Sequence, residues 1–194
     1  MTTLGSRDAV PTLRTQRLIL RDWRDADLEP FARLNADPVA MEHFPSTLDT
    51  AATVELIEVI RRRWRDDGRC WWAVEELATG SFVGAVGLML VHFDAPFHDV
   101  EHAPATEVGW RLLPSMWGRG YATEAASASV DWGFEHLGLD EIVSFTVVDN
   151  VRSRRVMERL GMEHDPAGGF EHPGVVDPES PLRQHVLYRL PASR

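Results

Sequence analysis

The spacing of hydrophobic positions predicts a strand and then two helices within the first 68 residues. Residues 17–23 alternate charged and apolar side chains, as a half-buried strand does. A first helix is predicted before the stretch 35–38, whose Asn and Pro end its pattern. A second helix begins at Asp49 or Thr50 and ends at Gly68. Its inner face is predicted to carry Val54, Ile57, Ile60 and Trp64.

The middle of the chain predicts a hairpin, a third strand and a long helix. Two apolar stretches, 70–75 and 82–90, flank the turn residues Thr79 and Gly80, which is typical of a β-hairpin. A polar loop at 91–105 and a strand at 106–113 follow. Small residues then recur at helical spacing, and such a face can approach a sheet closely. This face carries Ala122, Ala125, Ala126, Ser129, Val130, Gly133 and Leu137.

The remaining residues are predicted to add two strands and one short helix. The stretch 142–148 is rich in β-branched and aromatic side chains, which favour a strand. Residues 151–160 form a predicted helix that ends at Gly161. The tail 162–182 is rich in Pro, Gly and acidic residues, so no regular element is predicted there. A last strand is predicted at 185–190.

Length and charge indicate one acidic globular domain. No linker or internal repeat divides residues 1–194, so we expect a single domain with a flexible segment at 1–12. The formal net charge of -10 excludes a general affinity for DNA or RNA, because phosphates would meet a repulsive field. The basic run 61–65 is expected to be a solvated helix face supported by Glu58 and Arg62.

The single cysteine, Cys70, excludes an intramolecular disulfide and a zinc ribbon. Because Cys70 adjoins an apolar stretch, we expect a buried core thiol rather than a nucleophile. Residues 1–10 lack the pattern of a secretory signal, and the longest near-apolar run, 82–91, is too short to span a bilayer. The sequence therefore predicts a cytoplasmic protein without a membrane partner.

A glycine-bearing loop between the strand at 106–113 and the long helix is the first candidate site. Backbone N–H groups at the start of a helix point outward at the positive end of its dipole, which suits a pyrophosphate. Gly118 and Gly120 allow the ligand to approach this turn. A Walker loop is excluded because Gly-Lys-Ser/Thr is absent, and Thr123 stands where a dinucleotide fingerprint needs Gly or Ala.

Several blocks of the sequence resemble a known family. Residues 107–112 (Glu-Val-Gly-Trp-Arg-Leu) and 117–125 (Trp-Gly-Arg-Gly-Tyr-Ala-Thr-Glu-Ala) resemble the acetyl-CoA-binding motif of GNAT acetyltransferases, in the RimJ/RimL-like branch. Residues 13–21 resemble the opening strand of that branch, and 150–162 resemble its Asn-x-x-Ser helix. The departures are Trp117, where Gln or Arg is usual, and Met162 in place of Phe. Neither affects a cradle made of backbone donors.

The resemblance implies a single-domain GNAT fold of the α/β class (α+β in some schemes). Its twisted, mixed, mostly antiparallel sheet is flanked by helices, and the strands at 106–113 and 142–148 splay apart. Acetyl-CoA is implied as the acetyl donor, with its pantetheine in the gap and no metal required. The residues implied in binding it are Trp110, Arg111, Leu112, Trp117, Gly118, Arg119, Gly120, Tyr121, Ala122, Thr123, Asn150 and Ser153.

The implied reaction is direct attack of a primary amine on acetyl-CoA in a ternary complex. Glu107 is the candidate base, and the alternatives are a solvent-facing edge carboxylate and a water in its place. Ser153 is the candidate to protonate the leaving thiolate and Asn150 to hydrogen-bond the cofactor, although either can also cap the helix. A backbone N–H of Trp110 or Leu112 is expected to stabilise the oxyanion.

The acceptor amine, from a protein N-terminus or a small molecule, is expected to be cationic. Acidic residues crowd two segments near the predicted acceptor mouth and would attract it. These are Asp94, Asp99, Glu101, Glu163, Asp165 and Glu171. His92, His98 and His102 share one of these loops, but their spacing matches no metal motif, so a solvated loop is preferred over a metal-binding protein.

Two further expectations accompany this assignment. A non-catalytic CoA-binding sensor or interaction module on the same fold is the alternative function from another class. A homodimer is compatible with the resemblance, because the family often dimerises.

Overall fold

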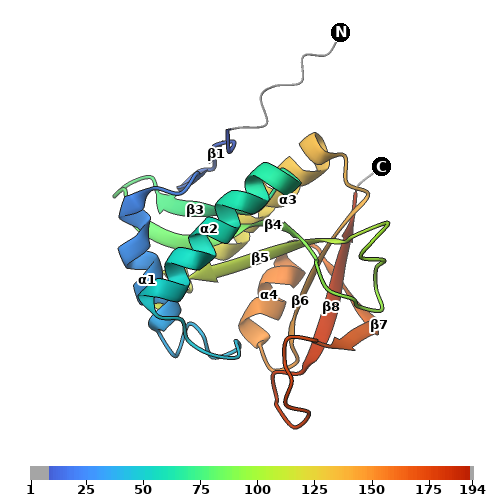
Figure 1. The fold of residues 1–194 in the computed structure, drawn as a ribbon. Helices are drawn as coiled ribbons and strands as arrows, with labels where there is room; N and C mark the ends of the chain where they lie inside the picture. The colour runs from blue at the N-terminus through green and yellow to red at the C-terminus, as the bar shows by residue number, and fades with distance from the viewer. Residues whose placement is uncertain (1–8, 193–194) are drawn as a thin grey trace.

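One eight-stranded sheet forms the centre of the protein (Figure 1). The computed structural model describes residues 9–192. The strands lie in the order β1-β2-β3-β4-β5-β6-β8-β7, and only the β5–β6 pair is parallel. They are β1 (Leu13–Arg14), β2 (Leu18–Arg21), β3 (Trp71–Glu76), β4 (Phe82–Leu90), β5 (Thr106–Leu112), β6 (Glu141–Val147), β7 (Glu163–Glu171) and β8 (Gln184–Pro191). The predicted mixed, mostly antiparallel sheet is confirmed.

Helices cover both faces of this sheet (Figure 1). One face carries α1 and α2, and the other carries α3 and α4. The helices are α1 (Leu28–Ala36), α2 (Thr50–Asp67), α3 (Tyr121–Leu137) and α4 (Val151–Arg159), with 3-10 turns at η1 (Asp25–Asp27) and η2 (Pro114–Met116). This is the layering that the order of predicted elements requires.

The limits of α2 follow from its caps, as predicted. The Asp49 carboxylate accepts the Ala52 N–H at 2.8 Å, and Gly68 ends the helix with φ 68°. One inner-face prediction is wrong, because Val54 is 41% exposed and Thr53 takes the buried position. The basic run also differs from expectation, since Arg61 rather than Arg62 pairs with Glu58.

The alternation of apolar and polar positions predicted neither β1 nor β7, although β1 lies within the block 13–21 that resembles the opening strand of the family. β1 is only two residues long, and β7 contains Pro166 and two glycines. The pairing of β7 with β8 shifts register between Asp165 and Phe170. This irregularity breaks the alternation of apolar and polar positions, so the segment lacks the sequence pattern of a strand.

The first residues of the described chain contact the core. Residues 1–8 of the predicted flexible segment lie outside the described residues. Val10 packs against the core, and the Pro11 carbonyl accepts the Trp72 indole N–H at 2.7 Å. Cys70 is buried, which confirms the expected core thiol, and burial raises the pKa of this thiol to about 11.

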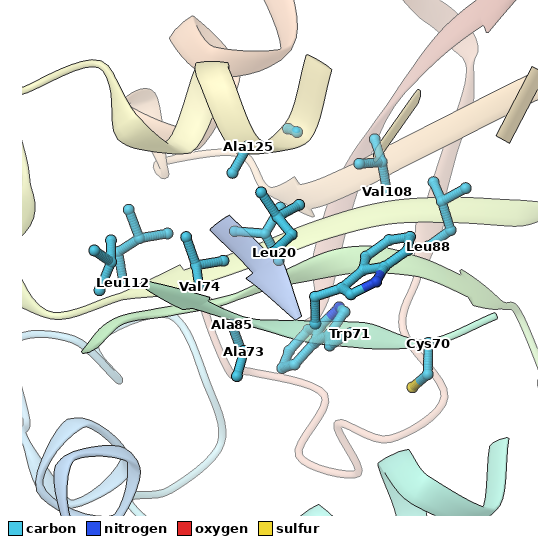
Figure 2. Close-up of a cluster of buried hydrophobic side chains, with 14 of the residues drawn as sticks. Leu20, Cys70, Trp71, Ala73, Val74, Ala85, Leu88, Val108, Leu112 and Ala125 are labelled. Atoms are coloured by element: carbon cyan, nitrogen blue, oxygen red, sulfur yellow. The ribbon is translucent and has the colours of Figure 1, made fainter. Parts of the chain in front are cut away.

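The core between the sheet and α3 depends on small residues in the helix. Figure 2 shows Leu88, Val108 and Leu112 on the face where Ala125 of α3 approaches them. At Gly133 there is no room for a side chain, because a Cβ there would lie 2.5 Å from Leu88 Cδ1. The predicted stripe of small residues therefore sets the distance between α3 and the sheet.

The two central strands separate after a single paired position. In the parallel β5–β6 pair, only Glu107 and Val143 are in register. The Ser144 hydroxyl then donates to the Val108 carbonyl at 2.9 Å, and no β5–β6 pairing continues toward Leu112. The implied splay is thus present, and it opens toward the start of α4.

Substitution of Gly133 should show how strongly this packing is constrained. The variant Gly133→Val places two methyl groups against Leu88 and Ile142, and such overpacking costs about 1–3 kcal/mol or more. We expect the midpoint of chemical denaturation to fall accordingly. Glu135→Val adds the same side chain on the exposed side of α3 and should change stability by less than about 1 kcal/mol. Equal losses in both variants would contradict the packing argument.

Candidate functional site

The loop before α3 has the backbone shape of an anion cradle. Gly118 and Gly120 adopt φ values of 74° and 80°, which favour glycine. No atom lies within 4 Å of a Cβ built at Gly118, and the nearest atom at Gly120 is Arg17 Nη2 at 3.4 Å. A ligand can therefore approach the backbone of this loop.

The first amides of α3 are free to bind a ligand. The Glu124 N–H donates to the Gly120 carbonyl at 3.0 Å, and no side chain caps the helix. Among the described residues, the N–H groups of Tyr121, Ala122 and Thr123 have no acceptor. Three converging donors at the positive end of a helix fit a pyrophosphate.

A polar strap, formed by Thr15, Arg17 and Glu124, fastens this loop to the start of the sheet. Glu124 accepts the Thr15 hydroxyl at 2.6 Å and the Arg17 N–H at 2.8 Å. The Arg17 guanidinium pairs with the same carboxylate and donates to the Arg119 carbonyl at 2.9 Å. These contacts lower the pKa of Glu124, although its burial opposes them.

The sequence analysis did not assign the strap to the site. The signal was present, because Thr15 and Arg17 belong to the block that resembles the opening strand of the family. The side chains of two predicted cradle residues are also held. The Tyr121 hydroxyl donates to the Glu76 carboxylate, and the Trp117 indole donates to the Leu112 carbonyl at 2.9 Å.

The edge of β5 that faces the gap carries the amides of Trp110 and Leu112. The Leu113 N–H donates to the Val83 carbonyl of the neighbouring chain segment at 3.0 Å. Along an antiparallel strand, the backbone N–H and C=O groups of successive residues point alternately to one neighbouring strand and to the other. The backbone groups at positions 107, 109 and 111 therefore bond to β4, and those at positions 108, 110 and 112 face β6. Arg111, expected among the cofactor-binding residues, therefore turns its backbone away from the gap.

The far side of the gap is lined by the start of α4. Asn150 caps this helix, because its side chain accepts the Ser153 N–H at 3.1 Å. Its amide group also donates to the Thr146 hydroxyl at 2.9 Å. The Ser153 hydroxyl accepts the Trp110 indole N–H at 3.0 Å, so a contact joins the two sides of the gap. The two predicted α4 residues thus lie together beside β5.

Glu107 lies on an interior strand and not at an edge of the sheet. Its side chain is partly buried, and it has no hydrogen bond or ion pair among the described residues. Burial raises the pKa of this carboxyl to about 8, while the charge of Arg63 acts in the opposite direction. A carboxyl with such a pKa can exchange a proton near neutral pH.

The three loop histidines have separate partners. His92 lies 3.2 Å from Asp67, His98 lies 2.9 Å from the Phe93 carbonyl, and His102 lies 3.0 Å from Asp99. Within residues 9–192, no three metal-ligating side chains come together. The same range holds no helix with the length and apolarity to cross a bilayer.

The acidic side chains near this loop are partly compensated. Asp165 pairs with Arg189 at 2.7 Å and Glu171 with Arg183 at 2.6 Å. These contacts lower the pKa of both carboxyls. The negative field here is therefore weaker than the number of carboxylates suggests.

An aromatic cluster that the sequence analysis did not anticipate lies on the same face of the sheet as Glu107. Phe145 of β6 packs 5.3 Å from Phe170 of β7 and 5.9 Å from Phe97 of the 91–105 loop, between ring centroids. His185 joins the cluster, and burial lowers its pKa to about 4. The cluster was missed because β7 was not predicted, and it gives this face an uncharged wall.

Comparison with known proteins agrees with this geometry. The sequence model of one protein family, the acetyltransferase (GNAT) domain, matches residues 17–163 of this chain. The protein YkkB of Bacillus subtilis is 30% identical over 158 residues, which cover 81% of this chain and 88% of YkkB. An Aspergillus fumigatus protein named FsC-acetyl coenzyme A-N(2)-transacetylase is 34% identical over 165 residues, 80% of this chain and 66% of its own.

A solved structure shares both the fold and part of the sequence. The crystal structure of an acetyltransferase from Agrobacterium tumefaciens superposes with a TM-score of 0.74 at 32% identity, covering 94% of this chain and 95% of its own. The family match includes Arg17 and Glu124 of the strap, the cradle, the splayed strands and α4. The chain therefore belongs to the GNAT family of acetyl-CoA-dependent N-acetyltransferases.

Proposed function

We propose that this enzyme passes the acetyl group of acetyl-CoA directly to a primary amine in a ternary complex. The observation that carries the proposal is that the described residues leave two sets of backbone donors unpaired, one at the start of α3 and one at the open edge of β5. The first part suits a pyrophosphate, and the second suits the amides of pantetheine, which can pair with a strand edge. The name of the Aspergillus relative adds support for an N-acetyl transfer.

Acetyl-CoA supplies an activated thioester, and the residues around the gap supply position and charge stabilisation. The N–H of Trp110 or Leu112 faces the gap, where it can donate to the oxygen of the tetrahedral adduct. The amine nitrogen forms a bond to the carbonyl carbon, and the carbon–sulfur bond then breaks. Glu107 takes the proton that the amine loses, directly or through a water.

Ser153 is suited to assist the leaving sulfur. Its hydroxyl oxygen accepts the Trp110 indole N–H, so the hydroxyl proton is free to donate to a thiolate in the gap. Asn150 fixes the first turn of α4 and with it the position of Ser153. The non-catalytic alternative would give no role to a partly buried Glu107 with a raised pKa on the strand that borders the gap.

The RimJ/RimL-like sequence blocks favour the α-amine of a protein or peptide as the acceptor and permit a small primary amine. Phosphates bound at α3 would occupy one face of the sheet, so the amine approaches from the other face, where Glu107 lies. Asp94, Glu101 and Glu163 have no ion-pair partner among the described residues. They can attract a protonated amine toward this face.

Substitution of Gly120 tests the cradle. In Gly120→Glu a carboxylate meets the site of the pyrophosphate, and we expect the Kd for CoA to rise by about 30-fold or more. Gly138→Glu is the matched control, because Gly138 has φ 63° at the other end of α3 with open space around it. It should strain the backbone similarly and leave the Kd unchanged in calorimetric titration. An unchanged Kd in folded Gly120→Glu would remove the proposed cofactor site.

The pH profile tests Glu107. A base acts only as the carboxylate, so a pKa raised from 4.5 to about 8 predicts that kcat/KM increases as pH rises through about 8. With an acceptor amine of pKa near 10, this limb is separate from ionisation of the substrate. Glu107→Gln should lower kcat/KM by about 100-fold and remove the limb, whereas Ser153→Ala should lower kcat and keep it. If the Glu107→Gln enzyme kept the pH profile of the wild type, Glu107 would not be the base and a water would take that role.

A further inference from the structure

Arg111 is a buried cation without a compensating carboxylate. Its side chain is 9% exposed, and no acidic side chain of the described residues lies within ion-pair distance. Its Nη1 donates to the Asn35 side-chain oxygen at 2.7 Å, and its guanidinium lies 4.1 Å from the centre of the Phe44 ring. Burial alone lowers its pKa to about 10. Nothing in the reaction described above uses this charge.

Arg21 shows how the same protein stabilises a buried arginine when the role is structural. Arg21 is 6% exposed and pairs with Asp27 at 2.7 Å and with Glu75 at 2.8 Å. Its pKa is raised by these contacts, whereas that of Arg111 is lowered. A buried charge that lacks such a partner destabilises the fold unless a ligand compensates it.

A second unpartnered donor lies beside Arg111. Within residues 9–192, neither Arg111 Nε nor Trp71 Nε1 has an acceptor, although both atoms are buried. The Arg111 guanidinium lies 5.4 Å from the Trp71 ring centre. The third buried donor without an acceptor, Arg69 Nε, belongs to a side chain that bonds to Thr106 at the start of β5. Arg111 Nε and Trp71 Nε1 therefore form a donor pair that is separate from Arg69 Nε.

The donor pair lies on the face from which the amine approaches. Along β5, positions 107, 109 and 111 share one face, opposite to that of Val108 and Leu112, which points toward α3. Trp71 covers Gly109, because a Cβ there would lie 3.3 Å from Trp71 Nε1. Arg111 therefore follows Glu107 along β5, with its guanidinium against the Phe44 ring and Trp71 beside it.

We propose that Arg111 and Trp71 form a subsite for a carboxylate carried by the acceptor, so that the acceptor is an amino acid or a small amino-carboxylate. This inference rests on the proposed acetyl transfer and names the substrate class of the same site. A guanidinium binds a carboxylate through two parallel hydrogen bonds, and the indole N–H adds a third donor. Phe44 covers the subsite from the segment between α1 and α2, and it must rotate to admit the carboxylate.

A comparison of amino acids with their amides tests the subsite. Release of CoA from acetyl-CoA is measured for a panel of α-amino acids and short amino-carboxylates, and for the amide of each. In the wild type, we expect amidation of the acceptor's carboxylate to lower kcat/KM by about 10-fold or more, mainly by raising KM. The reason is that the amide loses the charged hydrogen bonds to the subsite. In Arg111→Gln this ratio of acid to amide activity should fall to about one, and in Trp71→Phe it should shrink. Arg111→Lys should restore part of it.

The possible outcomes separate this inference from the proposed function. A wild-type enzyme that prefers amides, or an acid-to-amide ratio that Arg111→Gln and Trp71→Phe leave unchanged, overturns the subsite. So does an enzyme that binds CoA in calorimetric titration and acetylates no member of the panel. If the wild type does not bind CoA, the proposed function fails first. Trp71→Phe keeps the aromatic ring, so it decides the question if the Arg111 variants do not fold.

Discussion

Backbone hydrogen bonding along β5 is the constraint on which the site depends. Every buried amide of a sheet needs a partner, and β5 obtains one on its β4 side along its whole length. On its β6 side the pairing stops after Glu107 and Val143. The remaining amides of that edge are left for a ligand that is itself an extended chain with amide groups. The strand thus stabilises the fold on one edge and offers a binding surface on the other.

Most of the fold could be predicted from sequence because local patterns determine it. The caps of α2 and the small-residue face of α3 are local features, and both were confirmed. The pairing of β7 with β8 depends on partners across a register shift, which periodicity does not reveal. Val54 was misplaced because valine is more hydrophobic than the neighbouring Thr53, whereas the structure buries Thr53, whose hydroxyl bonds to Asn35 and to the Asp49 carbonyl.

In the candidate site, too, the features set by local sequence could be predicted, and those set by contacts between distant residues could not. The glycine loop, Asn150 and Ser153 could be predicted because each belongs to a contiguous motif that resembles a family. The strap at Glu124 could not be predicted as a unit, because its members are 107 residues apart in sequence. Arg111 was assigned to the cofactor from its position in a motif. The alternation of strand faces places its side chain on the face of β5 opposite α3, next to Asn35 of α1.

The long separation between the strap residues links cofactor binding to the last stages of folding. Contacts between distant residues form late, because closing a long loop costs entropy before the contact stabilises it. The cradle is therefore complete only when the N-terminal strands have docked onto α3. A ligand that binds only this state stabilises it by mass action. Bound CoA would thus slow local opening of β1 and β2, and amide hydrogen exchange in these strands would report whether the distant cradle is occupied.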